Sequence, residues 1–482
     1  MRKLLLIFSV IVLSFASSFS FAADPIPEPT LSPNANKYDP SHPENLEPDQ
    51  LYAESAILIT ADTSEVIFDK DAYSVHFPAS TTKIMTVLLG IIMVDDLYQT
   101  VTVSETALYD IDSDSSTMGL QVGEEIRYID VLYGTILRSG NDGANVIAET
   151  VSGSIASFVD LMNNTASLFG CQNTHFMNPH GLHNDNHYTT AYDMALIARE
   201  AMKNDLFRQI AGTTSYTIAR TNKQRKRTIT TKTEYMLPGS EENPNKYFYP
   251  DATGIKTGSH SRSGYCFVGS ASRNGVDLIS VVFFTGRRAR WADTIKLMDY
   301  GFSQYVSVTP LELYSMNPKT IETSGYSTSD TKRGKVQLIC RAKNNETQPV
   351  IVTTKAEAER LAANIQDILL FQYTRDFVAP ITAGEIMGTV TYFTDKGVSA
   401  EYDLIASRSV AARDNAPKTL EQIVEETNAD PNPFPPFSPE IALILLGPLF
   451  ALFIIIVLLR LIFRHKRSRA PHVPHPVNRY LK

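Results

Sequence analysis

The chain has 482 residues, 43% of them hydrophobic, and a formal net charge of -8 at pH 7. This length suits two globular domains with additional segments, and the negative charge argues against nucleic acid as a partner. The three cysteines show neither the spacing of a disulfide framework nor that of a metal site.

The N-terminus has the features of a secretory signal peptide. Arg2 and Lys3 precede an apolar run from Leu4 to Phe15, and small residues follow up to Ala22-Ala23. Residues 1–23 are therefore expected to be removed. Residues 24–50 contain many prolines and few large apolar side chains, which predicts an extended linker.

The pattern over residues 51–306 predicts one α+β domain, in which helices cover an antiparallel sheet. Strand patterns occur near both ends of this segment, and apolar residues three and four apart indicate helices between them. Asn274-Gly275 is a typical hairpin turn. The expected strands are 55–59, 66–68, 254–257, 265–270 and 276–284, and the expected helices are 129–137, 143–151, 154–169, 190–202 and 290–300.

Short strand patterns over residues 307–410 predict a second, small β-rich domain, within which 356–364 is either a short helix or a polar strand. Residues 411–440 are rich in proline and acidic residues and read as a stalk. The apolar run 441–463 is long enough to cross a bilayer. The basic residues in 464–482 place that end in the cytoplasm and the body of the protein outside the cell.

The first candidate site is Pro78-Ala79-Ser80-Thr81-Thr82-Lys83, which leads into an apolar segment typical of a buried helix. Ser80 and Lys83 then lie on one face. A hydroxyl beside an amine that burial keeps neutral forms an activated nucleophile. The alternative is an ordinary first-turn serine beside an exposed lysine.

Two further polar triplets follow at chain positions where a serine–lysine nucleophile would need them. Ser139-Gly140-Asn141 lies between two predicted helices and could also be a simple capping turn. Lys256-Thr257-Gly258 leaves an apolar strand and could also be a strand end with an exposed lysine.

Together, in this order, the three elements resemble the signature of the penicillin-recognising serine acyl-transferases. More narrowly, the chain resembles the D-alanyl-D-alanine carboxypeptidases of the low-molecular-weight penicillin-binding class. Residues 176–182 (Phe-Met-Asn-Pro-His-Gly-Leu) and 190–195 (Thr-Ala-Tyr-Asp-Met-Ala) match stretches typical of these enzymes. The resemblance covers about residues 51–306 well, and more loosely the region up to about residue 408.

The resemblance implies a β-lactamase/transpeptidase-like fold and a role for each matching residue. Ser80 would be the nucleophile, Lys83 the general base and Ser139 the proton relay to the leaving amine. Asn141 would hold the substrate amide and orient Lys83. The terminal carboxylate would bind to Lys256 and Thr257.

By the same resemblance, backbone N–H groups of Ser80 and Ser259 would form the oxyanion hole, and Gly258 would leave room for substrate along the strand edge. Arg290 is a candidate for binding the carboxylate, in competition with Arg287 and Arg288. The implied partners are peptidoglycan stem peptides and β-lactam antibiotics. No cofactor or metal is implied.

Other features leave alternatives open. His260 occupies a position where the family usually has threonine, and residues 220–254 are longer and more polar than usual. The run 223–227 could contact anionic wall polymers, or it could be a solvated hairpin tip. A metal site could use the histidines at 175, 180, 183 and 187. Alternative functions are a serine β-lactamase and a non-catalytic sensor that binds β-lactams or peptidoglycan.

Overall fold

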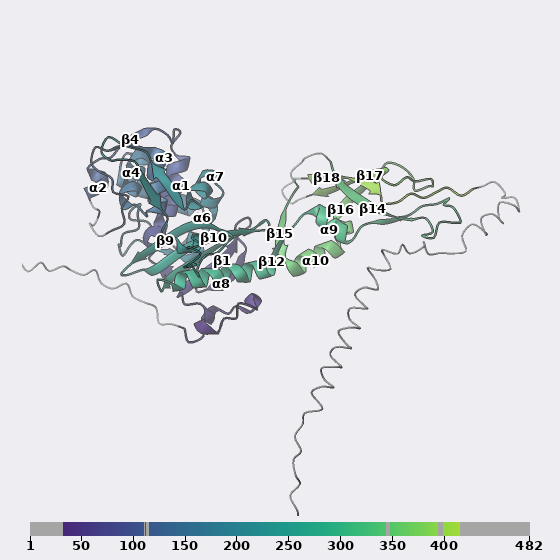
Figure 1. Cartoon of the computed structure of the whole chain (residues 1–482), viewed down its shortest axis with the longest axis horizontal. Helices are drawn as coiled ribbons and strands as arrows, with labels where there is room; N and C mark the ends of the chain where they lie inside the picture. The colour runs from purple at the N-terminus through teal and green to yellow at the C-terminus, as the bar shows by residue number, and fades with distance from the viewer. Residues whose placement is uncertain (1–31, 110, 112–114, 344–347, 394–398, 415–482) are drawn as a thin grey trace, which may run out of the picture. The chain divides into compact units, whose positions relative to one another are not determined.

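The computed structural model describes residues 32–109, 111, 115–343, 348–393 and 399–414 (Figure 1). The predicted signal peptide, the stalk beyond residue 414, the predicted span 441–463 and the basic tail lie outside these ranges. Among the described residues, no helix combines the length and apolar character needed to cross a membrane.

The first domain is built on an antiparallel five-stranded sheet with strand order β2-β1-β11-β10-β9. The expected strands and the Asn274-Gly275 hairpin are confirmed, and both turn residues have positive φ. Every residue of β1 is buried, because helices cover both faces of the sheet. The strands are β1 (Ser55–Thr60), β2 (Val66–Lys70), β9 (Ala252–His260), β10 (Gly264–Arg273) and β11 (Val276–Thr285).

The predicted helices between the strands are also confirmed. α6 packs against β1 and β11 in the larger apolar cluster, whereas α8 packs against the same sheet in a separate cluster. The sequence analysis missed α2 and α7. The helices are α1 (Lys83–Ile92), α2 (Thr106–Tyr109), α3 (Tyr128–Leu137), α4 (Asn141–Ser152), α5 (Ile155–Leu168), α6 (Ala191–Met202), α7 (Asp205–Ala211) and α8 (Ala289–Gln304).

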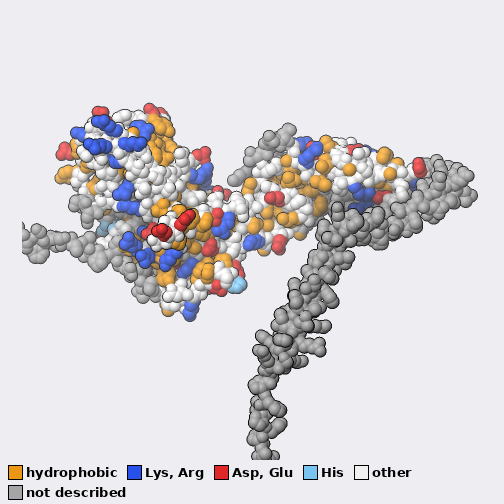
Figure 2. Space-filling view, in the orientation of Figure 1, with side chains coloured by type: hydrophobic (Ala, Val, Ile, Leu, Met, Phe, Trp, Pro, Cys, Tyr) orange, Lys and Arg blue, Asp and Glu red, His pale blue; other side chains and the backbone are white. Residues whose placement is uncertain are grey.

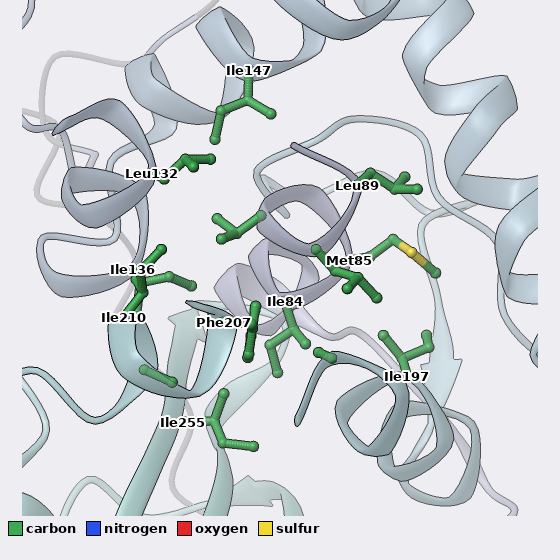
Figure 3. Close-up of a cluster of buried hydrophobic side chains, with 14 of the residues drawn as sticks. Ile84, Met85, Leu89, Leu132, Ile136, Ile147, Ile197, Phe207, Ile210 and Ile255 are labelled. Atoms are coloured by element: carbon green, nitrogen blue, oxygen red, sulfur yellow. The ribbon is translucent and has the colours of Figure 1, made fainter. Parts of the chain in front are cut away.

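Helix α1 lies at the centre of the larger cluster (Figure 3). Its residues Lys83–Ile91 are all buried, as the largely apolar sequence of this segment predicts. Side chains from α3, α4, α6, α7 and β9 surround it, among them Leu132, Ile147, Ile197, Phe207 and Ile255. This packing fixes the position of the turn that precedes α1.

The linker expected over residues 24–50 is wrong for its described part. Residues 32–50 form three 3₁₀ turns, η1 (Ala35–Lys37), η2 (Pro43–Asn45) and η3 (Pro48–Gln50), and η2 packs on α8. Lys296 Nζ donates hydrogen bonds to Ala35 O (3.0 Å) and Gln50 O (2.6 Å). Leu46 is 5% exposed. Pro43 and Pro48 each start one of these turns, and partners distant in sequence hold the segment in place.

Three small strand pairs complete the domain: β3 (Val75–His76) with β6 (Thr189–Thr190), β4 (Thr100–Thr102) with β5 (Glu125–Arg127), and β7 (Ser215–Ile218) with β8 (Arg227–Thr230). The basic run 223–227 lies at the exposed end of the β7–β8 hairpin, where only Gln224 and Arg227 are half-buried. Figure 2 shows basic side chains gathered on the domain near α3, against which this hairpin packs. A short 3₁₀ helix, η5 (Glu234–Met236), leads toward β9.

The second domain contains an antiparallel sheet of order β13-β14-β18-β17-β16. Residues 355–363 are helical, which settles the alternative left open there. The expected boundary at 306 falls inside β12, which pairs with β15. The elements are β12 (Tyr305–Val308), α9 (Pro310–Met316), β13 (Thr320–Glu322), β14 (Lys335–Ala342), β15 (Ile351–Thr354), α10 (Lys355–Ala363), α11 (Ile365–Ile368), β16 (Leu369–Tyr373), β17 (Ile386–Phe393) and β18 (Ser399–Ala406).

The packing of the N-terminal segment gives a stability prediction. Leu46→Ala should lower the free energy of unfolding by about 2 kcal/mol, because it leaves a cavity against α8. Urea titration of the purified protein measures this loss. The matched control is Leu168→Ala, since Leu168 is 84% exposed. Equal stability of the two variants would contradict the structural role of residues 32–50.

Candidate active site

Ser80 lies in a 3₁₀ turn, η4 (Ala79–Thr82), that continues directly into α1 at Lys83. A 3₁₀ helix has three residues per turn, so residues i and i+3 are aligned. Lys83 Nζ is consequently 3.0 Å from Ser80 Oγ. Pro78 precedes this turn as its cap, instead of occupying the first turn of an α-helix as the sequence suggested.

The Lys83 amine is buried among polar partners from distant segments. It lies 2.7 Å from Asn141 Oδ1 and 2.6 Å from the carbonyl oxygen of His180. Burial, reinforced by the positive charge of Lys256, holds the pKa of Lys83 well below its ordinary value of 10.5. The fold therefore places the Ser80 hydroxyl beside a buried amine whose charged form is disfavoured.

The second triplet forms the junction between α3 and α4. Ser139 has φ +59°, a left-handed conformation that turns the chain between the helices. Asn141 is the first residue of α4. The buried carboxylate of Asp142 accepts backbone N–H bonds from Met118, Gly119 and Leu120, which fixes the preceding loop against this junction.

The third triplet lies on β9, at the edge of the sheet. Lys256 Nζ donates to Ser139 Oγ at 3.0 Å, so the second and third triplets meet. Burial, together with the nearby charges of Lys232 and Arg290, lowers the pKa of Lys256 to about 7. Thr257 is half-buried and Ser259 exposed on the same strand.

The structure shows a packing reason for glycine at position 258. A Cβ at this position would lie 2.9 Å from Pro78 O and 3.1 Å from Ser80 N. Glycine is thus required because β9 packs against the backbone of η4, the turn that contains Ser80. The same approach brings Ser80 N beside Gly258, one residue from Ser259.

Among the three candidate arginines, Arg290 is the one whose charge lowers the pKa of Lys256. Its guanidinium stacks on Tyr265 and Trp291, with ring distances of 5.2 and 4.4 Å. Burial lowers the pKa of Arg290 to about 10. Arg287 and Arg288 are exposed.

The histidines do not form a metal centre: within the described ranges no group of three His, Cys, Asp or Glu side chains could hold an ion. His260 instead closes the β9–β10 turn, because its Nδ1 accepts backbone N–H bonds from Arg262 and Ser263, both at 3.1 Å. His187 is buried and lies 2.9 Å from Thr82 Oγ1.

Lys232 is a residue of the site that the sequence analysis missed. Its Nζ donates to Ser116 Oγ at 3.1 Å, and Ser116 O accepts the backbone N–H of Asn141 at 2.9 Å. Its positive charge also lowers the pKa of both Lys83 and Lys256. The only sequence signal was a lysine within the unusually long polar segment before β9.

The comparisons with known proteins agree with this geometry. The family model for D-alanyl-D-alanine carboxypeptidase matches residues 42–285. D-alanyl-D-alanine carboxypeptidase DacF of Bacillus subtilis is 32% identical over 369 residues, which cover 74% of this chain and 86% of the relative. D-alanyl-D-alanine carboxypeptidase of Streptomyces sp. K15 is 33% identical over 252 residues, or 50% of this chain and 84% of the relative.

Among solved structures, penicillin binding protein 5 of Haemophilus influenzae is similar over 76% of this chain and all of that protein, with 26% identity and a TM-score of 0.50. This likeness includes the β-rich second domain, which the family-model match alone does not reach. The chain therefore belongs to the D-alanyl-D-alanine carboxypeptidase family, whose members are serine-type hydrolases of the penicillin-binding class.

Proposed function

We propose that Ser80 removes the terminal D-alanine from pentapeptide stems of peptidoglycan through a covalent acyl-enzyme. Ser80 Oγ attacks the carbonyl carbon of the last peptide bond, that C–N bond breaks, and D-alanine leaves as a free amino acid. Water then hydrolyses the ester to release the shortened stem. The observation that carries this proposal is the 3.0 Å contact between Ser80 Oγ and the buried Lys83 Nζ.

The partners of Lys83 orient it as a base. Asn141 Oδ1 and the His180 carbonyl can only accept hydrogen bonds. A neutral amine has two N–H groups for these acceptors, which leaves its lone pair for the proton of Ser80. Ser139, which accepts a hydrogen bond from Lys256, then supplies a proton to the departing nitrogen.

The other predicted residues fit the substrate's charged groups. Backbone N–H groups of Ser80 and Ser259 stabilise the oxyanion that forms on the attacked carbonyl. The carboxylate of the last residue binds to Thr257, Lys256 and Arg290, which explains a preference for chain ends. A β-lactam follows the same first step: its ring amide opens and leaves Ser80 acylated.

The predicted span 441–463 would tether the enzyme to the membrane, with both domains on the wall side of the cell. The support for this arrangement is the sequence: an N-terminal secretory signal, an apolar run of sufficient length and a basic tail. The second domain would then hold the active site at a distance from the membrane.

The first test is replacement of the nucleophile. Ser80→Ala should abolish both D-alanine release from a peptide ending in D-Ala-D-Ala and labelling by a fluorescent penicillin, because neither acyl-enzyme can form. Ser74→Ala, an exposed serine six residues earlier, is the control and should retain both. Labelling of wild-type protein without any release would instead identify a non-catalytic sensor.

The assignment of Arg290 predicts a defect specific to carboxylates. Arg290→Leu should reduce kcat/KM for a D-Ala-D-Ala peptide by roughly ten- to a hundredfold, the usual value of a charged hydrogen bond. For the C-terminal amide of the same peptide the loss should be much smaller. Arg288→Leu serves as the control because Arg288 is exposed. Equal losses on acid and amide would refute the assignment.

Lys232 gives a prediction of pH dependence. As base, Lys83 must be neutral, so kcat/KM rises with pH through the pKa of Lys83. Lys232→Met removes a positive charge that lowers this pKa, and the acidic limb of the pH profile should move to higher pH. Lys226→Met, an equal change of charge on the exposed hairpin, should leave the limb in place. An unshifted limb in Lys232→Met would contradict the electrostatic role.

A further inference from the structure

The carbonyl of Ala79 and the N–H of Ser80 belong to one peptide unit. A peptide unit is planar and trans, so its C=O and N–H point in opposite directions. Whatever holds the Ala79 oxygen therefore aims the Ser80 N–H, the donor that the proposed function assigns to the oxyanion hole. This inference rests on that assignment.

Two contacts hold the Ala79 oxygen. Thr82 Oγ1 donates a hydrogen bond to it at 2.8 Å. The loop residue Gly181 packs so closely that a Cβ on it would lie 1.8 Å from the same oxygen. Ala79 itself has φ +48°, a conformation that a residue with a side chain rarely adopts unless its surroundings impose it.

Behind Thr82 lies His187, which is 2% exposed. Its Nδ1 accepts the backbone N–H of Met177 at 3.1 Å, so the ring proton is on Nε2. Nε2 lies 2.9 Å from Thr82 Oγ1. Since the Thr82 hydroxyl uses its one proton on Ala79 O, His187 must be the donor in this contact. The chain of hydrogen bonds runs from Met177 through His187 and Thr82 to Ala79.

We propose that His187 and Thr82 are positioning residues for the oxyanion hole: they orient the Ala79–Ser80 peptide so that the Ser80 N–H meets the developing negative charge. His187 acts throughout in its neutral form, because burial, together with neighbouring histidines and Lys83, lowers its pKa to about 3. Protonation of His187 would place a proton on Nδ1, which would then face the backbone N–H of Met177 and could no longer accept its hydrogen bond.

The neighbouring Thr81 provides a matched comparison. It is equally buried, and its hydroxyl also donates to a carbonyl three residues earlier, Pro78 O at 2.7 Å. That carbonyl belongs to the Pro78–Ala79 peptide, which carries a different N–H. Helical threonines often make such bonds, so an effect specific to Thr82 separates the proposed role from ordinary turn stability.

The experiment compares Thr82→Val with Thr81→Val in the full chain. The rate of Ser80 acylation by a fluorescent penicillin is measured per labelled site, so that unfolded protein does not contribute. Affinity for a peptide boronic acid, whose tetrahedral adduct mimics the oxyanion intermediate, is the second readout. Removing an oxyanion donor outright costs roughly 10²–10³ in rate. In Thr82→Val the Ser80 N–H should lose its orientation. The acylation rate and the affinity for the boronic acid should then each fall about ten- to a hundredfold, which is more than in Thr81→Val.

A second pair of variants keeps the test independent of Thr82. His187→Gln retains a group that can donate to Thr82, whereas His187→Phe does not, so Gln should retain more acylation activity than Phe. Equal acylation rates for Thr82→Val and Thr81→Val, or for the two His187 variants, would overturn the inference. In that case the wild-type protein would still be labelled, and the proposed function would stand. Wild-type protein that is not labelled at all would refute the proposed function and the inference with it.

Discussion

The removal of the Lys83 amine from water is the constraint on which the rest of the site depends. Burial disfavours the charged form of lysine, so the role of base proposed for Lys83 requires that water stays out of the core around α1. The apolar faces of α3, α4, α6 and α7 around α1 meet this requirement (Figure 3). The Lys83 amine donates its hydrogen bonds to Asn141 Oδ1 and to the carbonyl oxygen of His180. The core of the domain thus stabilises the fold and also lowers the pKa of Lys83.

The positive charges around the site also disfavour the charged form of Lys83. Lys256 and Lys232 favour the neutral form of Lys83, and Arg290 acts in the same way on Lys256. Each of these cations also adds to a field that attracts an anionic chain end. One arrangement therefore lowers the pKa of Lys83 and, under the proposed function, favours binding of the substrate carboxylate. A reduction in positive charge weakens both effects together.

Apolar periodicity and turn chemistry are local signals, and they predicted the sheet and most helices. The meeting of the three triplets was implied instead by the resemblance to the carboxypeptidase family. The sequence did not predict the ordering of residues 32–50, which depends on Lys296 and other partners about 250 residues away in the chain. Nor did it identify Lys232, since an exposed lysine in a polar segment has no distinguishing pattern. Lys232 can be assigned to the site only in the folded structure, where Ser116 links it to Asn141.

The predicted residues nearest the chemistry owe their geometry to small residues around them. Gly181 and Gly258 are far apart in the sequence, yet a Cβ on either would collide with backbone atoms of residues 78–81. The turn η4, which contains Ser80, is thus held between the loop 176–182 and the edge strand β9. This explains why both glycines lie within segments that resemble the family although neither has a side chain to react. Where two backbone segments must approach each other closely, the residue type is restricted to glycine, even though glycine has no side chain that could take part in the chemistry.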